Sequence, residues 1–242
     1  MAKFAFITGG TKGIGNAVAV CLAKTGYDLL LTFGPDTEEE VNSAVSICSN
    51  FGVNVTALHA DISCKKSIKD IVAYISQNKI YIDTVVFNAG LTYREPLETM
   101  EQAEWEKIFF ANVHFPVFLL QQIVDRIKPG GSVVFTGSLM GIEPHASSLS
   151  YGVTKAAVHA LTKNLVKFLT PYHIRVNAVA PGFVDTEWQK NKPEEIRRNI
   201  EQKIALGRFC TPEEIAEVFK MLIENNYFNG EIIVVDGGYS YR

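Results

Sequence analysis

Three residues in the second half of the chain carry groups that could exchange a proton with a carbonyl or an alcohol. Lys155 follows Tyr151 by four residues, and Ser138 precedes the tyrosine by thirteen. Side chains four residues apart lie on one face of a helix, with Cβ atoms about 5–6 Å apart. A tyrosine hydroxyl titrates at about pH 10, and a neighbouring ammonium lowers that pKa. We therefore expect Tyr151 to exchange the proton, Lys155 to lower its pKa, and Ser138 to hold the substrate oxygen.

Ordinary structural roles are the alternative for these residues. Tyr151 could be a buried tyrosine, Lys155 a surface lysine and Ser138 the cap of a turn. The chemistry therefore also requires a source of hydride and a fold that brings the three groups together.

Apolar segments alternate with helix-like periodicity along almost the whole chain. Strands are expected at Lys3–Thr8, Asp28–Phe33, Val53–His59, Ile82–Asn88, Ser132–Gly137, Ile174–Ala180 and Glu231–Asp236. Helices are expected at Gly13–Lys24, Glu38–Asn50, Ser67–Gln77, 101–112, 116–128, Tyr151–Leu169, Pro193–Ile204 and Pro212–Glu224. This alternation predicts an α/β fold, a doubly wound, mostly parallel sheet of about seven strands with helices on both faces. With 242 residues, 47% of them hydrophobic, the chain is expected to form one domain over residues 1–242.

A glycine-rich turn, TGGTKGIG at residues 8–15, follows the first expected strand and opens a helix. Residues without Cβ let backbone N–H groups approach a pyrophosphate at such a turn. Contacts to a dinucleotide are expected from Gly9, Thr11, Lys12, Gly13, Ile14 and Gly15. The alternative is a tight connection that binds nothing.

The end of the second expected strand bears on the choice of dinucleotide. An NAD site usually has a carboxylate there for the ribose hydroxyls. Here the strand ends at Phe33-Gly34, and the first carboxylate is Asp36. Lys12 lies within the glycine turn, where it can reach a 2′-phosphate, so we expect NADP(H). Alternatively, Lys12 is a solvated lysine and Asp36 binds the ribose.

Two further segments lie at the carboxyl ends of expected strands. Asn88, Ala89 and Gly90 close the fourth strand, where small residues let a dinucleotide cross the edge of the sheet. Asp61 and Ile62 follow the third strand and are expected to contact the adenine. Asp61 could instead cap the helix that follows.

These segments occur together and in order, and they resemble the short-chain dehydrogenase/reductase family over essentially the whole chain. The resemblance is carried by TGGTKGIG at 8–15, NAG at 88–90, Asn112, Ser138, Tyr151 with Lys155, and Pro181-Gly182. Within the family the chain is most similar to 3-oxoacyl-[acyl-carrier-protein] reductases, through NAVAPGFVDT at 177–186 and GEIIVVDGG at 230–238.

The resemblance implies a reaction, the reduction of a carbonyl to a secondary alcohol by hydride transfer from NADPH. Tyr151 would be the general acid, Ser138 would orient the carbonyl, and Lys155 would hold the nicotinamide ribose. Asn112 would hold a water that links Lys155 to solvent; it could instead cap its helix. The nicotinamide contacts would come from Pro181, Gly182, Val184 and Thr186. The segment 183–206 would form a lid over the substrate.

Departures from the family pattern leave the substrate open. Tyr93 stands where many of these reductases have a basic residue, and one of two arginine regions that dock acyl carrier protein has no clear arginine. The most favoured substrate is a 3-oxoacyl thioester, with acyl carrier protein as a possible partner. The alternatives are another ketone, a sugar or a polyol, and, in a different class, a non-catalytic dinucleotide-binding protein.

Composition and charge limit the remaining possibilities. A net charge of -3 argues against a nucleic-acid partner. The four cysteines are widely spaced, and the histidines show no metal-ligand spacing, so we expect a cytoplasmic protein without a metal site. The apolar stretch Phe109 to Ile127 is interrupted by polar residues and is not expected to span a membrane. The family resemblance further implies a homotetramer that pairs the helices at 101–128 and 151–169.

Overall fold

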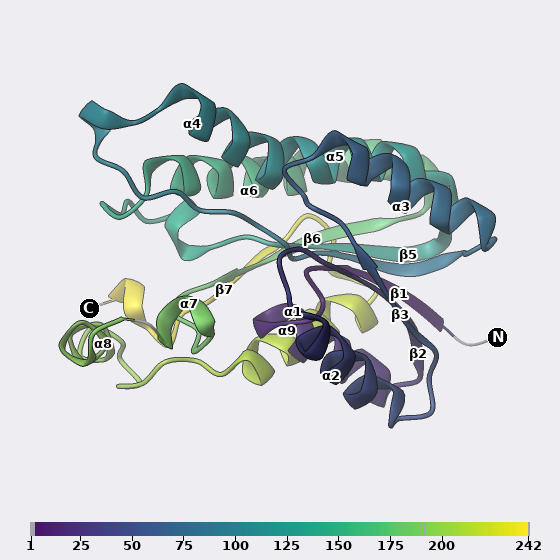
Figure 1. Ribbon diagram of the computed structural model, residues 1–242, viewed down its shortest axis with the longest axis horizontal. Helices are drawn as coiled ribbons and strands as arrows, with labels where there is room; N and C mark the ends of the chain where they lie inside the picture. Colours follow the sequence, from purple (N-terminus) through teal and green to yellow (C-terminus); the bar gives the residue numbers. More distant parts are fainter. Residues whose placement is uncertain (1–2, 191, 242) are drawn as a thin grey trace.

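A computed structural model describes residues 3–190 and 192–241, and these residues build one seven-stranded sheet. Its order is β3-β2-β1-β4-β5-β6-β7, and all six neighbouring pairs are parallel. The strands are β1 (Lys3–Thr8), β2 (Tyr27–Phe33), β3 (Val55–His59), β4 (Ile82–Phe87), β5 (Ile127–Thr136), β6 (Arg175–Pro181) and β7 (Ile232–Val235). The predicted doubly wound fold is therefore confirmed. Because all strands are parallel, they end at one edge of the sheet (Figure 1).

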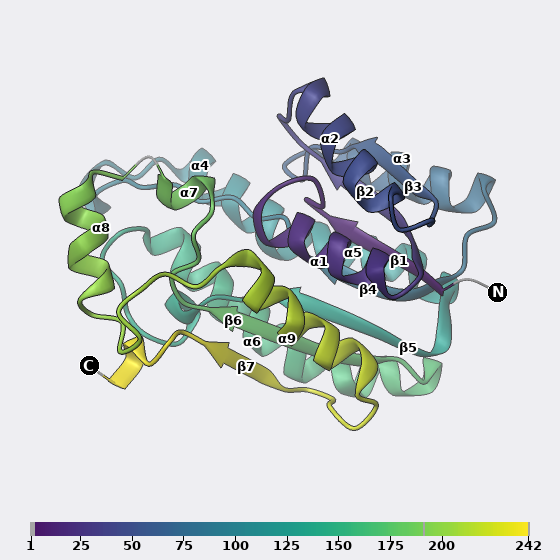
Figure 2. The same ribbon diagram turned by 90° about the horizontal axis from the view of Figure 1, so that it is seen from below.

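Helices cover both faces of the sheet (Figures 1 and 2). One layer contains α3 (Lys65–Gln77), α4 (Gln102–Phe109), α5 (Phe115–Ile123) and α6 (Leu149–Leu169). The opposite layer contains α1 (Gly13–Lys24), α2 (Glu38–Ser49) and α9 (Pro212–Glu224), with α7 (Glu187–Lys190) and α8 (Glu194–Glu201) beyond the carboxyl edge. Short 3₁₀ turns lie at Leu97–Thr99, Val124–Arg126, Leu139–Gly141, Thr170–Tyr172 and Tyr239–Tyr241.

The two faces of the sheet pack two separate hydrophobic cores. Phe6 of β1 points into the core beneath α3, α5 and α6, and its neighbour Ile7 points into the core beneath α1 and α9. In β4, Val85 likewise points into the first core and Val86 into the second. Side chains alternate between the faces of a strand, so a strand buried on both sides reads as a continuous apolar run. This is why the strands were recognisable from sequence.

Several boundaries differ from the sequence prediction. Strand β5 begins at Ile127, five residues before the predicted start, and contains Pro129-Gly130-Gly131. Its pairing with β4 shifts register between Ile82 and Thr84, and Gly130 has a φ of +84°. The bulge accommodates residues that otherwise indicate a break. Helix α6 starts two residues earlier than predicted, and the lid contains the additional helix α7.

The two helices predicted at 101–112 and 116–128 form one continuous helical run, Gln102–Arg126, with a π-helical turn at Phe110–His114. By length and composition alone this run is apolar enough to cross a bilayer. Its apolar side chains Phe115, Leu119 and Ile123 are, however, buried in the core between α3, α6 and the sheet. Burial in the core of the fold therefore accounts for the apolar character.

Candidate active site

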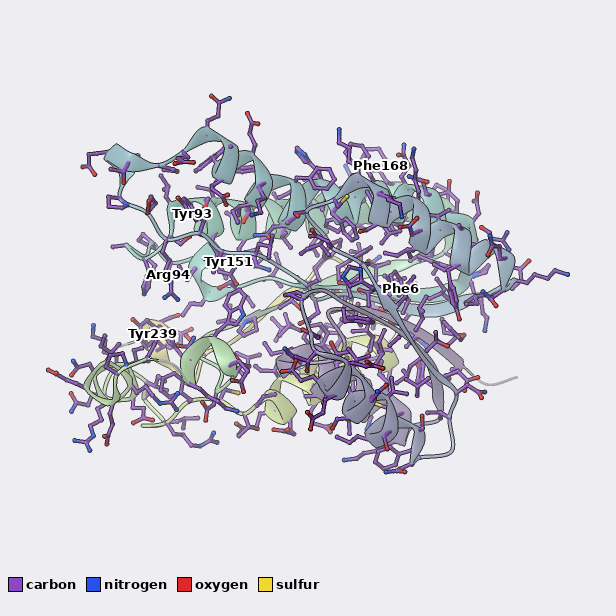
Figure 3. The ribbon with its side chains drawn as sticks, in the orientation of Figure 1. Phe6, Tyr93, Arg94, Tyr151, Phe168 and Tyr239 are labelled. Carbon is purple, nitrogen blue, oxygen red and sulfur yellow. The ribbon has the colours of Figure 1, made fainter. Side chains whose placement is uncertain are left out.

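Helix α6 places Tyr151 in its first turn, at the carboxyl edge of the sheet. Ser148 is the N-cap, and its Oγ accepts a hydrogen bond from the Tyr151 N–H at 3.4 Å. The same Oγ donates to the carbonyl of Tyr93, which follows β4. Ser148 therefore connects the backbone of Tyr151, at the start of α6, to the loop that contains Tyr93 (Figure 3).

Ser138 lies directly after β5 and faces the tyrosine. Its Oγ accepts a hydrogen bond from Met140 N at 3.1 Å, and its side chain lies close enough to the Tyr151 hydroxyl to lower the pKa of Tyr151. Ser138 is buried, and it does cap a turn, the alternative considered from sequence. The capping contact and the contact with the phenol coexist in one side chain.

Lys155 lies one helical turn beyond Tyr151 and is only 4% exposed. Its Nζ lies 5.4 Å from the centroid of the Tyr151 ring and donates to the carbonyl of Thr136 at 2.6 Å. The predicted face of the helix is therefore confirmed, and the alternative of a surface lysine is wrong.

Burial controls the pKa values of this pair. Burial raises the pKa of Tyr151 to about 12, against a smaller lowering by the Ser138 hydrogen bond. Burial also lowers the pKa of Lys155 to about 8. In this structure the Tyr151 pKa thus moves opposite to the sequence expectation of a lowering by Lys155. Removing charged groups from water outweighs the attraction between them.

Asn112 lies in the π-helical turn at Phe110–His114, within the helical run and not at its end. Its Nδ2 donates to Leu91 O and to Thr154 Oγ1, each at 2.9 Å, and its Oδ1 accepts from Leu91 N at 2.8 Å. The amide thus joins α6 to the loop after β4, and the helix-cap alternative is wrong.

A cavity of about 10 Å³ lies between Asn112, Lys155 and Thr136. That volume is near the smallest that holds one water molecule. Polar groups of all three residues line it, alongside apolar side chains from α5 and the sheet. The cavity is therefore a suitable place for the water that the family resemblance implies.

The glycine turn provides a cradle at the N-terminus of α1. A Cβ on Gly15 would lie 2.0 Å from the Gly9 carbonyl oxygen, so this position excludes any side chain. Gly13 has a φ of +51°, and a Cβ there would lie 3.3 Å from the Thr186 methyl group of the lid. Helix α1 has no side-chain cap at its N-terminus. Free N–H groups and close approach of the backbone fit a dinucleotide pyrophosphate.

Asn88 ties this turn to β4. Its Nδ2 donates to the carbonyls of Thr8 and Gly9 at 3.2 and 3.1 Å, while the N–H groups of Asn88 and Ala89 donate to Thr8 Oγ1. A Cβ on Gly90 would lie 3.6 Å from Lys155 Nζ. The NAG segment therefore connects the glycine turn to the lysine.

At the far end of the cradle, Lys12 is held by two carboxylates. Its Nζ lies 3.1 Å from Asp36 Oδ1 and 2.8 Å from Glu40 Oε2, and Thr11 Oγ1 donates to Asp36. The hydrogen bond from Lys12 and that from the Thr37 backbone lower the pKa of Glu40 to about 2. Lys12 is thus not a freely solvated lysine.

The residues predicted beside the adenine lie at the ends of β2 and β3. The Phe33 ring packs edge-on against His59 at 5.4 Å, and Ile62 is buried. Asp61 Oδ1 accepts from the N–H and Oγ of Ser63, which lowers the pKa of Asp61. The N-cap of α3 is Cys64, so the helix-cap alternative for Asp61 is wrong.

The segment after β6 leads from the sheet into the lid. Pro181 is the last residue of β6, and a Cβ on Gly182 would lie 2.9 Å from Asp236 after β7. Val184 is buried and pairs with Cys210. The Trp188 ring in α7 lies 6.0 Å from the Tyr151 ring, edge to face.

His159 belongs to the site but is not among the site residues predicted from the sequence. It lies one turn beyond Lys155 on α6 and is 7% exposed. Its Nε2 accepts a hydrogen bond from Ser138 N at 3.3 Å. Burial lowers the pKa of His159 to about 4, with a further lowering by Lys155. The continued four-residue spacing Tyr151, Lys155, His159 was the sequence signal.

Comparison with known proteins agrees with this arrangement. A family model described as enoyl-(acyl carrier protein) reductase matches residues 9–240. The chain belongs to the short-chain dehydrogenase/reductase family. It is 32% identical over 240 residues to the 3-oxoacyl-[acyl-carrier-protein] reductase FabG of Aquifex aeolicus, covering 98% of this chain and 96% of that protein. It is 35% identical to tropinone reductase-like 3 of Erythroxylum coca, covering 98% and 92%.

Solved structures of the family have the same fold. A short-chain dehydrogenase/reductase from Serratia marcescens superimposes with a TM-score of 0.91 at 28% identity, covering 98% of both chains. A short-chain dehydrogenase from Burkholderia cenocepacia, solved in complex with NADP, gives 0.91 at 25% identity and the same coverage. This short-chain dehydrogenase/reductase is thus an NAD(P)-dependent oxidoreductase.

Proposed function

We propose that this short-chain dehydrogenase/reductase reduces the ketone of a 3-oxoacyl thioester to a secondary alcohol with NADPH. The observation that carries the reaction is the joint placement of Tyr151, Ser138 and Lys155. Ser138 lies close enough to the Tyr151 hydroxyl to lower its pKa, and Lys155 Nζ lies 5.4 Å from the centroid of the tyrosine ring. Two hydroxyls directed at one point can both donate to a single carbonyl oxygen.

In the proposed mechanism the bound nicotinamide supplies a hydride to the carbonyl carbon. Tyr151 gives its proton to the oxygen, and Ser138 donates a hydrogen bond that holds this oxygen in place. With its pKa raised to about 12, Tyr151 is protonated at neutral pH, as a general acid must be. Lys155 and Asn112, on either side of the small cavity, would replace the proton through a water.

Substitution of Tyr151 by Phe tests this role, because it removes one oxygen and keeps the ring. We expect kcat for ketone reduction to fall by about 10²–10⁴-fold, the usual contribution of a general acid. Dinucleotide binding and the melting temperature should change little. Near-normal turnover by Tyr151→Phe would refute the mechanism.

We infer a preference for NADPH from the position of Lys12 in the glycine turn. To bind Lys12, a 2′-phosphate would have to compete with the carboxylates of Asp36 and Glu40. The preference for NADPH over NADH should therefore be moderate. Lys12→Ala should lower kcat/KM for NADPH by at least about tenfold, because it removes one charge-assisted contact with the 2′-phosphate. It should change kcat/KM for NADH little. Glu40→Gln is the matched control and should increase the preference. A wild-type preference for NADH would refute this inference.

We infer a 3-oxoacyl thioester as the substrate from the similarity to proteins named as 3-oxoacyl-[acyl-carrier-protein] reductases. The tropinone reductase-like relative supports the alternative, another ketone. The region that would dock the carrier offers Arg126 and Lys128, and both are engaged within the chain: Lys128 Nζ is 2.7 Å from Asp83, and Arg126 lies over the Tyr81 ring. Initial rates with acetoacetyl thioesters and with a panel of ketones, sugars and polyols decide between them. Coenzyme binding without turnover on any of these would favour a non-catalytic protein.

We further propose a homotetramer in the cytoplasm, assembled through α4, α5 and α6. These helices expose Phe118, Val153 and Phe168, the last with 72% exposure (Figure 3). A paired apolar face of this kind is buried in stable oligomers. Light scattering after size-exclusion chromatography gives the mass directly. Phe168→Asp should shift the tetramer toward smaller species, and a monomeric wild-type protein would refute the proposal.

A further inference from the structure

Three positively charged side chains, Arg94, Lys192 and Lys203, lie near the proposed active site and act on the same histidine, His145. Arg94 lies on the chain between β4 and α4, and Lys192 and Lys203 lie on the lid side, before and after α8. Within residues 3–190 and 192–241, none of these three cations is within ion-pair distance of a carboxylate. This differs from most of the lid, where Lys190 pairs with Glu187 and Arg197 with Asp185.

The charges in this cluster act on one another. Lys192 is half-buried, and burial lowers its pKa, with further lowering by Arg94 and Arg197. Burial also lowers the pKa of His145, and the charges of Lys192, Lys203 and Arg94 lower it further. Every charge that affects these two groups is positive, on a chain with a net charge of -3. Neighbouring cations of this kind repel one another and create a local positive potential.

Aromatic rings, together called the aromatic wall here, lie beside the cations and beside Tyr151. Lys192 Nζ lies 5.7 Å from the centroid of the Phe183 ring, which also lies 6.4 Å from His145 and 5.0 Å from Tyr239. Arg94 lies on the side of its loop that faces Tyr239 (Figure 3). Trp188, four residues before Lys192, contacts Tyr151. A chain leaving the reacting carbonyl along this wall would therefore reach the cations.

We propose that Arg94 and Lys192, together with Lys203, bind an anionic group that the substrate carries at a distance from its carbonyl. The group is a phosphate or a carboxylate, because the planar guanidinium of arginine pairs with both oxyanions and lysine adds a point charge. The proposal rests on the proposed function, in that Tyr151 marks the position of the carbonyl. If the proposal holds, the enzyme selects its substrate by charge as well as by shape.

A pair of ligands that differ by one phosphate tests the subsite without turnover. Pantetheine and 4′-phosphopantetheine are titrated calorimetrically into the enzyme saturated with NADP⁺. We expect 4′-phosphopantetheine to bind at least about tenfold more tightly, and the ratio to fall below about twofold in Arg94→Gln/Lys192→Gln. Equal affinities, no binding of either compound, or a ratio that survives in the double variant would overturn the proposal.

Turnover separates this proposal from the proposed function. The acetoacetyl thioesters of the same two compounds should both be reduced, with a higher kcat/KM for the phosphorylated one. If both are reduced equally well, the subsite is wrong and the thioester reductase stands. If neither is reduced, the thioester function is wrong, and the calorimetric ratio still decides the subsite.

A methyl ketone whose terminal carboxylate lies as far from the ketone as the phosphate does in acetoacetyl-4′-phosphopantetheine, compared with its methyl ester, distinguishes a carboxylate from a phosphate as the natural anion. A preference for this oxo acid that Arg94→Gln/Lys192→Gln abolishes assigns the subsite to carboxylates, while a phosphate preference alone assigns it to phosphates. Lys69→Gln/Lys167→Gln is the matched control, because it removes two exposed cations on α3 and α6. This control should retain the wild-type ratios; a ratio lost equally in the control would mean that net charge alone is responsible, which overturns the proposal.

Discussion

His159 should make the stability of this reductase depend on pH through the position of Ser138. The neutral imidazole accepts the Ser138 N–H at Nε2, so a protonated ring cannot make this bond. Burial lowers the pKa of His159 to about 4, from 6.5 in the exposed state. The cations Lys155 and Lys163 lower it further, and a hydrogen bond to the Gly141 backbone acts in the opposite direction.

The sign and size of the effect follow from proton binding. Below about pH 6.5 the unfolded chain binds a proton at this residue that the folded chain does not. The stabilising contribution is therefore complete above about pH 6.5 and is lost as the pH falls toward 4. At about 1.4 kcal/mol per pH unit the full difference is about 3 kcal/mol, of which about 2.5 kcal/mol is lost by pH 4.5.

Urea denaturation of the wild type and His159→Gln at pH 7.5 and at pH 4.5 measures this contribution. Glutamine can accept the Ser138 N–H but does not titrate. We expect the free energies of unfolding to be similar at pH 7.5, and His159→Gln to lose about 2.5 kcal/mol less than the wild type on going to pH 4.5. His59→Gln, at an exposed histidine, should follow the wild type. Parallel losses in the wild type and His159→Gln would refute the reasoning.

Three further substitutions have expected outcomes. Gly137→Ala would place a Cβ 2.2 Å from His159 Nε2, so it should lower both the melting temperature and kcat. Thr211→Ala removes the capping box of α9, and should cost about 1 kcal/mol, or about 2–4 °C in melting temperature, without changing KM. Lys155→Met should abolish activity yet raise the free energy of unfolding at pH 7 by about 3 kcal/mol, a gain that should vanish above about pH 10.5. A destabilised Lys155→Met would show that the buried charge is compensated.

The sequence predicted which residues lie at the site better than it predicted the hydrogen bonds and ion pairs between them. The spacing of Tyr151 and Lys155 placed both on one face of α6, because helical periodicity is local. The parallel sheet then brought Ser138 from the end of β5 and Asn88 from the end of β4 to the same edge. Where periodicity and strand direction sufficed, the prediction was correct.

Long-range contacts account for what the sequence could not show. Asn112 bonds to Leu91 and Thr154 from a π-helical turn, and no local pattern marks that turn. Lys12 pairs with carboxylates instead of being solvated because the loop after β2 folds back on the glycine turn. The early start of β5 requires the bulge with β4, which overrides the break indicated by Pro129-Gly130. Each difference reflects a contact between distant segments.

Tyr151 and Lys155 show why residue types alone did not give the direction of a pKa shift. A tyrosine beside a lysine suggests a phenol made more acidic, yet both groups are buried, and the cost of removing charge from water acts on each. Burial therefore keeps the proton on Tyr151 and brings the Lys155 pKa down to about 8. At neutral pH the phenol is protonated and the amine still carries its charge. A protonated phenol can donate its proton, and the neighbouring cation can stabilise the phenolate that remains.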